Sequence, residues 1–431
     1  MSTRPLDLVI IGNGAAGVEA ALAIREAGFM GDLDLFADNR HPPYNPMLGT
    51  YYASGAIPSR RCFPYGGAEF YDRHGIRAHL AMRVQQLDPG EMSFTTAAGE
   101  RHTYRKCLVA SGAATVFPSV PGLSPPAVLG LRSFDDAGKL RQAAESAAAL
   151  AATGSRRARA LVVGASFAGI SVATLLLRAG MEVVLVEREE MILPLAAHLV
   201  CARAIERHFR ELGLALRLRT SVAAVEDEGS RLRVRLRSES GEGRRVRKAR
   251  EEELDLVIVC AGSRPSLDFV NKGEVALETG LVVDEHMRTS AADLFAAGDV
   301  AQAPDPVNGG HKVVPLWSNA RRQGRVAGLN MVGVHAEYVA GVPCNVQHVG
   351  GLLFASGGSL DGCDTFDVTS TRRGLRVLAY RSGRLAGFNL LGDVRLSGPL
   401  VRTLARDAGL RDDDPAEGWT RGITWTRVNA S

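Results

Sequence analysis

The sequence lacks the cysteine pairs that mark several classes of redox and metal protein. Its 431 residues include six cysteines, and no two of them form a Cys-x-x-Cys pair. We therefore expect no redox dithiol of that type, and no zinc, iron–sulfur or other metal site of the usual ligand spacing. Scattered cysteines are typical of a reducing compartment, which predicts a cytoplasmic location.

Long apolar runs and a strong charge of one sign are also missing. No run reaches the roughly 20 residues that cross a bilayer, and the N-terminal one carries Asp7, so we expect neither a membrane span nor a signal peptide. The net charge is only +4. A basic run at 244–250 adjoins three glutamates at 251–253, which suits either a polyanion patch or a solvated hairpin of mixed charge. We favour the hairpin and expect no nucleic-acid or membrane partner.

Glycine is present where a nucleotide-binding turn needs it. An apolar run at 6–11 leads into Gly12-Asn13-Gly14-Ala15-Ala16-Gly17, and a helix is expected over 15–27. Gly12 permits the tight turn, Gly14 lets a pyrophosphate approach the backbone, and Gly17 lets the helix pack closely on its strand. The helix N-terminus would then face the phosphates.

Asp38 follows the next expected strand, 33–36. An acid at this place binds the adenosine ribose hydroxyls, although a solvated turn aspartate is the alternative. The loop at 41–46 is stiffened by three prolines and can present backbone atoms to a flat ring.

A second glycine unit is nested inside the first. A strand at 160–163 precedes Gly164, and Gly169 stands where Gly17 stands in the first unit. This internal repeat predicts a second nucleotide site. The strand at 182–186 ends before Glu187, whose carboxylate favours the 2′-hydroxyl of NADH over the 2′-phosphate of NADPH. Arg188 follows directly and weakens that preference.

Small residues close three further expected strands. The run at 108–113 contains Ala110-Ser111-Gly112, and 260–263 repeats the pattern after a strand at 254–259, which leaves room for a cofactor above the sheet. The segment 289–299 ends in Gly298-Asp299, where a carboxylate can accept hydrogen bonds from sugar-alcohol hydroxyls. Pro315 to Asn319 then opens a helix with a small-residue face.

These motifs resemble the FAD-dependent pyridine-nucleotide reductases, especially their ferredoxin, rubredoxin and nitrite reductase-like branch. The resemblance covers nearly the whole chain and includes 316–331, while 341–345 and 385–393 resemble that branch's C-terminal interface domain. It implies that the first unit holds FAD and the nested unit holds NAD(P)H. Hydride would pass from nicotinamide to the flavin, and electrons then to a redox protein such as ferredoxin, rubredoxin or an oxygenase component.

The resemblance also implies the site residues. Those expected at FAD are Gly12, Gly14, Ala15, Ala16, Gly17, Asp38, Pro46, Val84, Ala110, Ser111, Gly112, Arg132, Gly298, Asp299, Leu316, Trp317 and Asn319. Those expected at NADH are Gly164, Ser166, Phe167, Gly169, Glu187, Arg188 and Gly262. The candidates for the flavin face are Tyr51, Ser171 and Trp317, and no side chain is assigned as acid, base or nucleophile.

Three departures from the family pattern concern the nicotinamide side. Ser166 replaces a glycine, Tyr51 stands where the family has a lysine, and Ser171 stands where it has a glutamate. Losing both charges together leaves neither one unpaired. The departures motivate an alternative function, a FAD-binding electron-transfer subunit with weak NADH use, and an NADH oxidase is a third reading. Cys62 could be a redox thiol, although the cysteine of thiol-using relatives lies nearer Leu48.

The expected fold is α/β, with two nested Rossmann-like domains and a C-terminal α+β interface domain. The FAD-binding domain is expected at 1–122 and 254–335, the inserted NAD(P)H-binding domain at 123–253, and the C-terminal domain at 336–431. The chain could form a homo- or hetero-oligomer.

Overall fold

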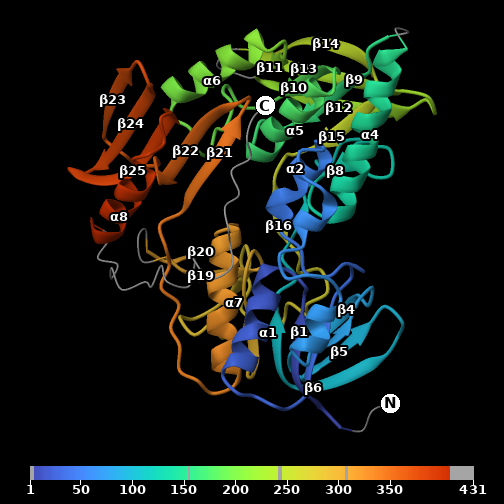
Figure 1. Cartoon of the computed structure of the whole chain (residues 1–431), viewed down its shortest axis with the longest axis vertical. Coiled ribbons are helices and arrows are strands. Elements are labelled where there is room, and N and C mark those ends of the chain that lie inside the picture. The colour runs from blue at the N-terminus through green and yellow to red at the C-terminus, as the bar shows by residue number, and fades with distance from the viewer. Residues whose placement is uncertain (1–3, 154–155, 241–244, 306–308, 408–431) are drawn as a thin grey trace.

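The computed structural model describes residues 4–153, 156–240, 245–305 and 309–407. Figure 1 shows α1, α7 and β1 at one end of the molecule, and the nested and C-terminal sheets at the other. No helix among the described residues is long and apolar enough to span a bilayer.

The first unit is built on a mainly parallel sheet with β1 near its centre. The order is β3-β2-β1-β6-β5-β4, with β18 also paired to β6. The strands are β1 (Leu6–Ile11), β2 (Leu33–Phe36), β3 (Arg77–His79), β4 (Val84–Asp88), β5 (Ser93–Thr96), β6 (Arg101–Val109) and β18 (Leu294–Ala296). Ile11 is in register with both Phe36 and Val109, so these parallel strands end at one common edge.

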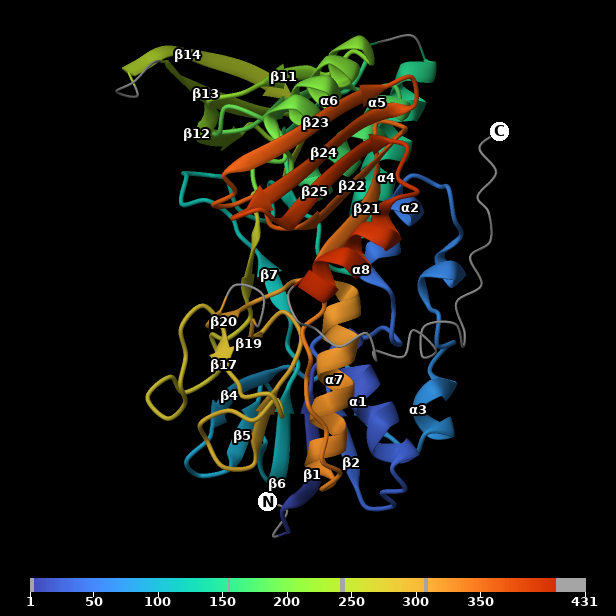
Figure 2. The same cartoon turned by 90° about the vertical axis from the view of Figure 1, so that its left-hand side faces the viewer.

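Two helices cover this sheet side by side in both views (Figures 1 and 2). They are α1 (Ala15–Glu26) and α7 (Trp317–Met331). A Cβ added at Gly324 would lie 2.1 Å from the carbonyl oxygen of Ala16, and one at Gly328 would lie 2.5 Å from that of Ala20. The expected small face of α7 is therefore confirmed, and these pairings show that the two helices run parallel.

The nested unit repeats this arrangement. Its parallel sheet has the order β11-β10-β9-β15-β8. The elements are β8 (Leu129–Gly130), α4 (Phe134–Ala152), β9 (Arg159–Val163), α5 (Phe167–Arg178), β10 (Glu182–Val186), α6 (Leu199–Glu211), β11 (Ala215–Arg217) and β15 (Leu256–Val259). Because β15 pairs with β9 and β8, the chain leaves this sheet after Val259 and not at the boundary expected before residue 254.

A two-stranded ribbon connects the two units. It pairs β7 (Ala113–Thr115) with β16 (Ser263–Pro265). The strand expected over 108–113 is consequently interrupted, since β6 ends at Val109 and β7 begins at Ala113. A further small sheet near the first unit contains β17 (Leu281–Val282), β19 (Ala301–Pro304) and β20 (His311–Lys312).

The C-terminal unit is an antiparallel sheet of order β21-β22-β25-β24-β23. Its elements are β21 (Cys344–Val349), β22 (Leu352–Gly358), β23 (Thr365–Thr371), β24 (Gly374–Arg381), β25 (Arg384–Gly392) and α8 (Ser397–Asp407). Phe354 and Leu391 belong to one apolar cluster with Leu176 and Phe209 of the nested unit. The backbone N–H of His198 also donates to the amide oxygen of Asn389 at 2.6 Å, so the two units share a core.

Residues 245–250 of the basic run lie in one strand of a hairpin, as favoured. The strands β12 (Thr220–Asp227), β13 (Leu232–Ser240) and β14 (Arg245–Leu254) form an antiparallel sheet. The turn at 241–244 and the side chains of 245–249 lie outside the described residues.

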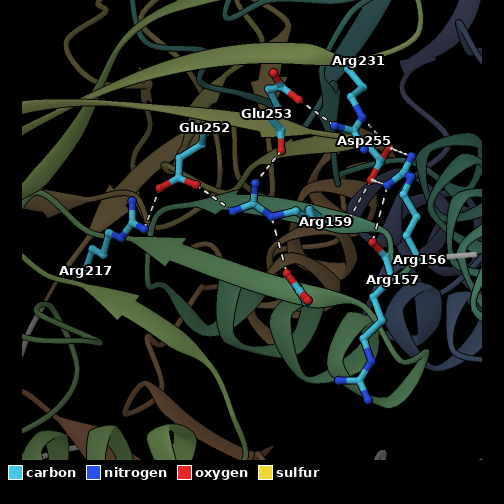
Figure 3. Close-up of polar contacts among 9 residues, drawn as sticks. Arg156, Arg157, Arg159, Arg217, Arg231, Glu252, Glu253 and Asp255 are labelled. Atoms are coloured by element: carbon cyan, nitrogen blue, oxygen red, sulfur yellow. Dashed lines mark hydrogen bonds and ion pairs between the residues drawn. The ribbon is translucent and has the colours of Figure 1, made fainter.

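Ion pairs attach this hairpin to the nested sheet (Figure 3). Glu252 of β14 accepts hydrogen bonds of 2.7 Å from both Arg159 of β9 and Arg217 of β11. Burial alone would raise the pKa of Glu252, but these two arginines outweigh it and hold the pKa below its usual value. Asp255 is bound by two nitrogens of Arg156, which lower its pKa.

The contact between α1 and α7 predicts the effect of a methyl group. We expect Gly324→Ala to destabilise the protein by about 3 kcal/mol, because the new methyl group meets the backbone of Ala16 and neither helix can yield alone. Gly138→Ala in α4 is the matched control, since a Cβ there meets nothing within 4 Å and alanine is the better helix former. Thermal unfolding of both variants checks this. Equal midpoints for the two would contradict the close contact.

The position of Glu252 predicts a pH-dependent loss of stability. We expect Glu252→Gln to cost about 2 kcal/mol at pH 7, because two arginines lose a charged partner that is only 11% exposed. A lowered folded-state pKa means that this stabilisation is complete above the ordinary value of 4.5 and is lost as the pH falls through the folded pKa. The gap between wild type and variant in urea unfolding should therefore shrink towards pH 3.

Glu251→Gln provides the control for that comparison. Glu251 is 60% exposed and lies 3.9 Å from Arg235, so its removal should change the unfolding midpoint little at either pH. A gap that stayed constant from pH 7 to pH 3 would show that the charge of Glu252 is not the cause.

Candidate functional site

The candidate site lies where the carboxyl ends of the two parallel sheets face each other. The loops after β1, β6 and β18 leave one edge, and those after β8, β9, β10 and β15 leave the other. Asp299, after β18, accepts a hydrogen bond from the guanidinium of Arg132, after β8. This ion pair joins the two edges, and the Asp299 side chain is 13% exposed.

Both glycine turns have backbone contacts that exclude a side chain. Gly12 has φ of +124°, and a Cβ there would lie 2.1 Å from the carbonyl oxygen of Ala110. Gly164 has φ of +102°, and a Cβ there would lie 2.6 Å from the carbonyl oxygen of Cys260. The third glycines, Gly17 and Gly169, would each place a Cβ within about 2 Å of a turn carbonyl. The repeat seen in the sequence is therefore a repeat of backbone geometry.

The N-terminus of α1 is open. Gly14 is its N-cap, no side chain caps the helix, and a Cβ at Gly14 meets nothing within 4 Å. The backbone N–H groups of the first turn, which begins with Ala15 and Ala16, have no partners within the helix. A negatively charged phosphate group suits such an end, because it can accept from these groups and interact with the helix dipole.

The N-terminus of α5 differs at the matching position. Ser166 is its N-cap, and the Ser166 hydroxyl accepts from the backbone N–H of Gly169 at 3.3 Å. The same hydroxyl donates to the carbonyl of Cys260 at 3.0 Å. The departure noted in the sequence thus places the serine side chain against the protein, where it occupies one of the donors that a phosphate could use.

The start of α7 carries a group of interacting side chains that the sequence did not reveal. The guanidinium carbon of Arg321 lies 4.8 Å from the centre of the Trp317 ring. Arg321 also pairs at 2.5 Å with Glu19 of α1, which is 7% exposed and accepts a second hydrogen bond from Tyr65. Burial is the main cause that raises the pKa of Tyr65. A lone glutamate on the small, buried face of α1 was the one sequence signal of this contact.

Asn319 is fixed by neighbouring residues. Its amide oxygen accepts from the Tyr338 hydroxyl at 2.6 Å, and its amide nitrogen donates to the carbonyl of Val314 at 3.1 Å. Leu316 is the N-cap of α7 and provides no side-chain hydrogen bond. Because α7 runs parallel to α1, the first-turn backbone N–H groups of the two helices point in the same direction.

The other residues expected at FAD lie in different surroundings. Asp38 is exposed after β2. The backbone N–H groups of Ala81 and Met82 donate to the carbonyls of Asn39 and Ala37, so the segment that leads to the buried Val84 passes beside Asp38 in space. The Ser111 hydroxyl donates to the carbonyl of Ser266 at 2.8 Å. Gly112 and Gly298 both have positive φ. Pro46 is exposed at the start of a short 3-10 helix.

Glu187, directly after β10, is buried against the glycine turn of the nested unit. One carboxylate oxygen accepts from the backbone N–H of Ala165 at 2.7 Å, and the other accepts from that of Glu189 at 3.0 Å. The Arg188 side chain is 83% exposed and pairs with Glu189 at 3.1 Å. Gly262 is exposed, with φ of +117° and open space at its Cβ position.

The candidates for the flavin face are not joined to one another. Tyr51 is 39% exposed, and among the described residues no hydrogen bond connects it to Ser171. The Ser171 hydroxyl instead accepts from the side-chain amide of Gln347 in β21, which also donates to the carbonyl of Phe167 at 3.1 Å.

Aromatic side chains surround the helix that carries Tyr51. This helix, α2 (Gly49–Ala53), packs on the nested unit, because Ala53 belongs to the nested core and Tyr52 stacks on Phe134 at 5.0 Å. Phe63 and His41 also lie close to Phe134. No periodic pattern marks this cluster in the sequence, since its members come from separate helices and loops.

Cys62 has the environment of a structural cysteine. It is fully buried, and burial raises the pKa of its thiol. A redox thiol needs access and a lowered pKa, so the surroundings do not support that reading. All six cysteines are free in the structure.

Comparison with known proteins settles the family. The family model described as pyridine nucleotide-disulphide oxidoreductase matches residues 6–324. The chain belongs to this family. It is therefore an oxidoreductase of a family that implies FAD and a pyridine nucleotide.

Individual relatives cover most of the chain. The epsilon subunit of NADH-dependent phenylglyoxylate dehydrogenase from Aromatoleum evansii is 29% identical over 93% of this chain and 92% of its own length. Rubredoxin-NAD(+) reductase from Pseudomonas putida is 26% identical over 88% of this chain and 94% of its own. A ferredoxin reductase structure from Rhodopseudomonas palustris superposes with a TM-score of 0.77 at 24% identity and covers 90% of this chain and 91% of its own. The α/β fold with an antiparallel C-terminal sheet is confirmed.

Proposed function

We propose that this protein is an FAD-dependent reductase that takes hydride from NADH and passes electrons to a protein acceptor. The observation that carries the proposal is the pair of facing sheet edges, each with a glycine turn, joined by Arg132 and Asp299. Two nucleotides bound in extended form along these edges would meet between them. Two relatives support the same function by their names, one a rubredoxin reductase and the other a subunit of an NADH-dependent enzyme.

The first unit fits FAD. The open cap at Gly14 suits the pyrophosphate, and the exposed carboxylate of Asp38 suits the ribose hydroxyls. Asp299, already a hydrogen-bond acceptor, suits the ribityl hydroxyls. The N-terminus of α7 would place its positive end near the flavin, where it favours a negative charge.

FAD, when bound, supplies hydride acceptance and release of single electrons, so the chain's own residues bind, orient and exclude water. The fixed backbone of α7 provides donors that need no rearrangement, because Asn319 and Tyr338 hold its first turn. Trp317, the first residue of α7, is held by the guanidinium of Arg321 over its ring. We also propose that residues 1–122 and 260–335 form the FAD-binding domain, 123–259 the NADH-binding domain and 336–431 the interface domain.

The nested unit fits NADH better than NADPH. Glu187 is held by two backbone N–H groups and keeps free lone pairs for a ribose hydroxyl. A 2′-phosphate at this place would face a buried negative charge. Arg188, the residue that could accept it, is directed to Glu189 and is largely exposed.

A second candidate function is an electron-transfer subunit that uses NADH poorly. The specific observation in its favour is Ser166, which caps α5 where the first unit leaves α1 open. The relative from Aromatoleum evansii is named as a subunit of a larger enzyme.

The open cap of α1 predicts that a hydroxymethyl group at Gly14 weakens FAD binding. We expect Gly14→Ser to fold, because its side chain meets open space and serine is a good N-cap, yet to weaken FAD affinity at least tenfold, or about 1.4 kcal/mol. The flavin-to-protein ratio after purification and FAD titration of the apoprotein measure this. Gly138→Ser adds the same group in open space elsewhere and should keep its flavin. Full flavin retention by Gly14→Ser would place FAD in another site.

Glu187 predicts coenzyme preference. Anaerobic stopped-flow reduction of the flavin should favour NADH over NADPH by at least about tenfold, because a 2′-phosphate near the carboxylate is repelled by more than about 1.4 kcal/mol. Glu187→Gln should narrow that ratio. Glu190→Gln is the control, because it changes a nearby carboxylate that is 61% exposed and pairs with Arg219, so it should leave the ratio unchanged. A preference for NADPH would contradict the role of Glu187. Slow reduction by both coenzymes would instead favour the electron-transfer subunit.

A further inference from the structure

A cluster of potential metal ligands lies at the C-terminal end of α7. The loop before β18 carries Glu285 and His286, and the segment that follows α7 carries His335 and Glu337. Since α7 has 15 residues, about 22 Å of helix separates this cluster from the sheet edges that form the candidate nucleotide site. Its residues have no role in the proposed reductase function.

Three of these side chains already converge. One ligand atom each from His286, His335 and Glu337 lie within 4.8 Å of one another. The two imidazole rings have their centres 4.6 Å apart. A nitrogen of His335 lies 3.5 Å from the carboxylate of Glu337.

Glu285 offers a fourth ligand. Its carboxylate lies 3.7 Å from Nε2 of His286. The ligands of a tetrahedral zinc ion are about 3.3 Å apart, as follows from bonds of 2.0–2.1 Å. The ligand atoms of His286, His335 and Glu337 therefore need to approach one another by up to about 1.5 Å. The side chains of His335, Glu337 and Glu285 are 72%, 62% and 58% exposed and can rotate to close the site.

His286 is oriented as a metal ligand. Its Nδ1 lies 2.9 Å from the carbonyl oxygen of Ala336, so Nδ1 carries the hydrogen and the lone pair is left on Nε2, the nitrogen 3.7 Å from the Glu285 carboxylate. A backbone carbonyl that fixes the second nitrogen in this way is the usual support of a metal-bound histidine. The His286 side chain is only 13% exposed, which limits its alternative positions.

A buried amide holds the two segments together. Asn330 of α7, 4% exposed, donates to the carbonyl of Ala336 at 2.7 Å and to that of His286 at 3.2 Å. Its amide oxygen accepts from the backbone N–H of Ala336 at 3.3 Å. The backbone N–H of Tyr338 also donates to the carbonyl of Glu285 at 2.6 Å. The ligand-bearing backbones are thus placed before any metal binds.

We propose that His286, His335 and Glu337, with Glu285 as a fourth ligand, form a binding site for a divalent cation of the zinc type. Two imidazoles select zinc and similar transition metals over Mg²⁺ and Ca²⁺, which prefer oxygen ligands. The bound ion ties the segment after α7 to the loop before β18. This segment continues into β21, so the ion stabilises the connection between the first unit and the C-terminal sheet.

Zinc titration of the full-length, tag-free and chelator-treated protein tests the site. We expect one equivalent of Zn²⁺ to bind in calorimetry and to raise the thermal midpoint, and we expect Mg²⁺ at the same concentration to do neither. The double variant His335→Ala with Glu337→Gln should bind Zn²⁺ at least about tenfold more weakly and lose the thermal shift. Because both side chains are exposed, the variant should fold, and circular dichroism checks this.

His311→Ala serves as the matched control, since it removes an exposed histidine from β20 of the same half of the molecule. It should bind Zn²⁺ as wild type does. The proposal is overturned if wild type binds no Zn²⁺ more tightly than the double variant does, or if Mg²⁺ produces the same thermal shift. Zinc affinity that falls in His311→Ala but not in the double variant would place the ion elsewhere and overturn it as well.

Discussion

The absence of a Cβ atom at a few backbone contacts is the constraint on which the structure depends. The carbonyl of Ala110 occupies the space beside Gly12, and the carbonyl of Ala16 occupies the space beside Gly324. The first contact fixes the turn between β1 and α1, and the second fixes α7 against α1. Together they direct two parallel helix N-termini to the edge where the strands end, which is where an anionic cofactor is best received.

The same constraint has been kept in the nested unit, but the helix cap has changed. Gly164 and Gly169 reproduce the backbone contacts of the first unit, so the sheet and α5 have the same relation. Ser166 provides a hydroxyl cap that α1 does not have. One unit therefore leaves its helix end without a side-chain cap, while the other partly satisfies it with its own hydroxyl. The two helix ends consequently differ in how many backbone donors are free.

Local patterns in the sequence were enough to predict the backbone of the candidate site. The glycine turns, the strands at 33–36 and 182–186 and the small face of α7 follow from short-range spacing, and the structure has all of them. The pairing of Glu19 with Arg321 spans 302 positions, and the contact of Arg132 with Asp299 spans 167, so no periodicity announces them. The sequence prediction also placed β15 in the wrong unit, because the apolar residues of a strand do not show which strand it pairs with.

The shared core of the nested and C-terminal units has a mechanical consequence. Phe354 and Leu391 belong to one apolar core with Phe209, so the nested and C-terminal units cannot slide past each other without disrupting that core. They are coupled to the first unit by the ribbon of β7 and β16, the segment after α7 and the loops that carry α2. Any hinge motion at these connections therefore swings the nested and C-terminal units as one rigid body. Because Arg132 and Asp299 belong to different sides of these connections, a hinge motion that separates the two sheet edges has to break their ion pair.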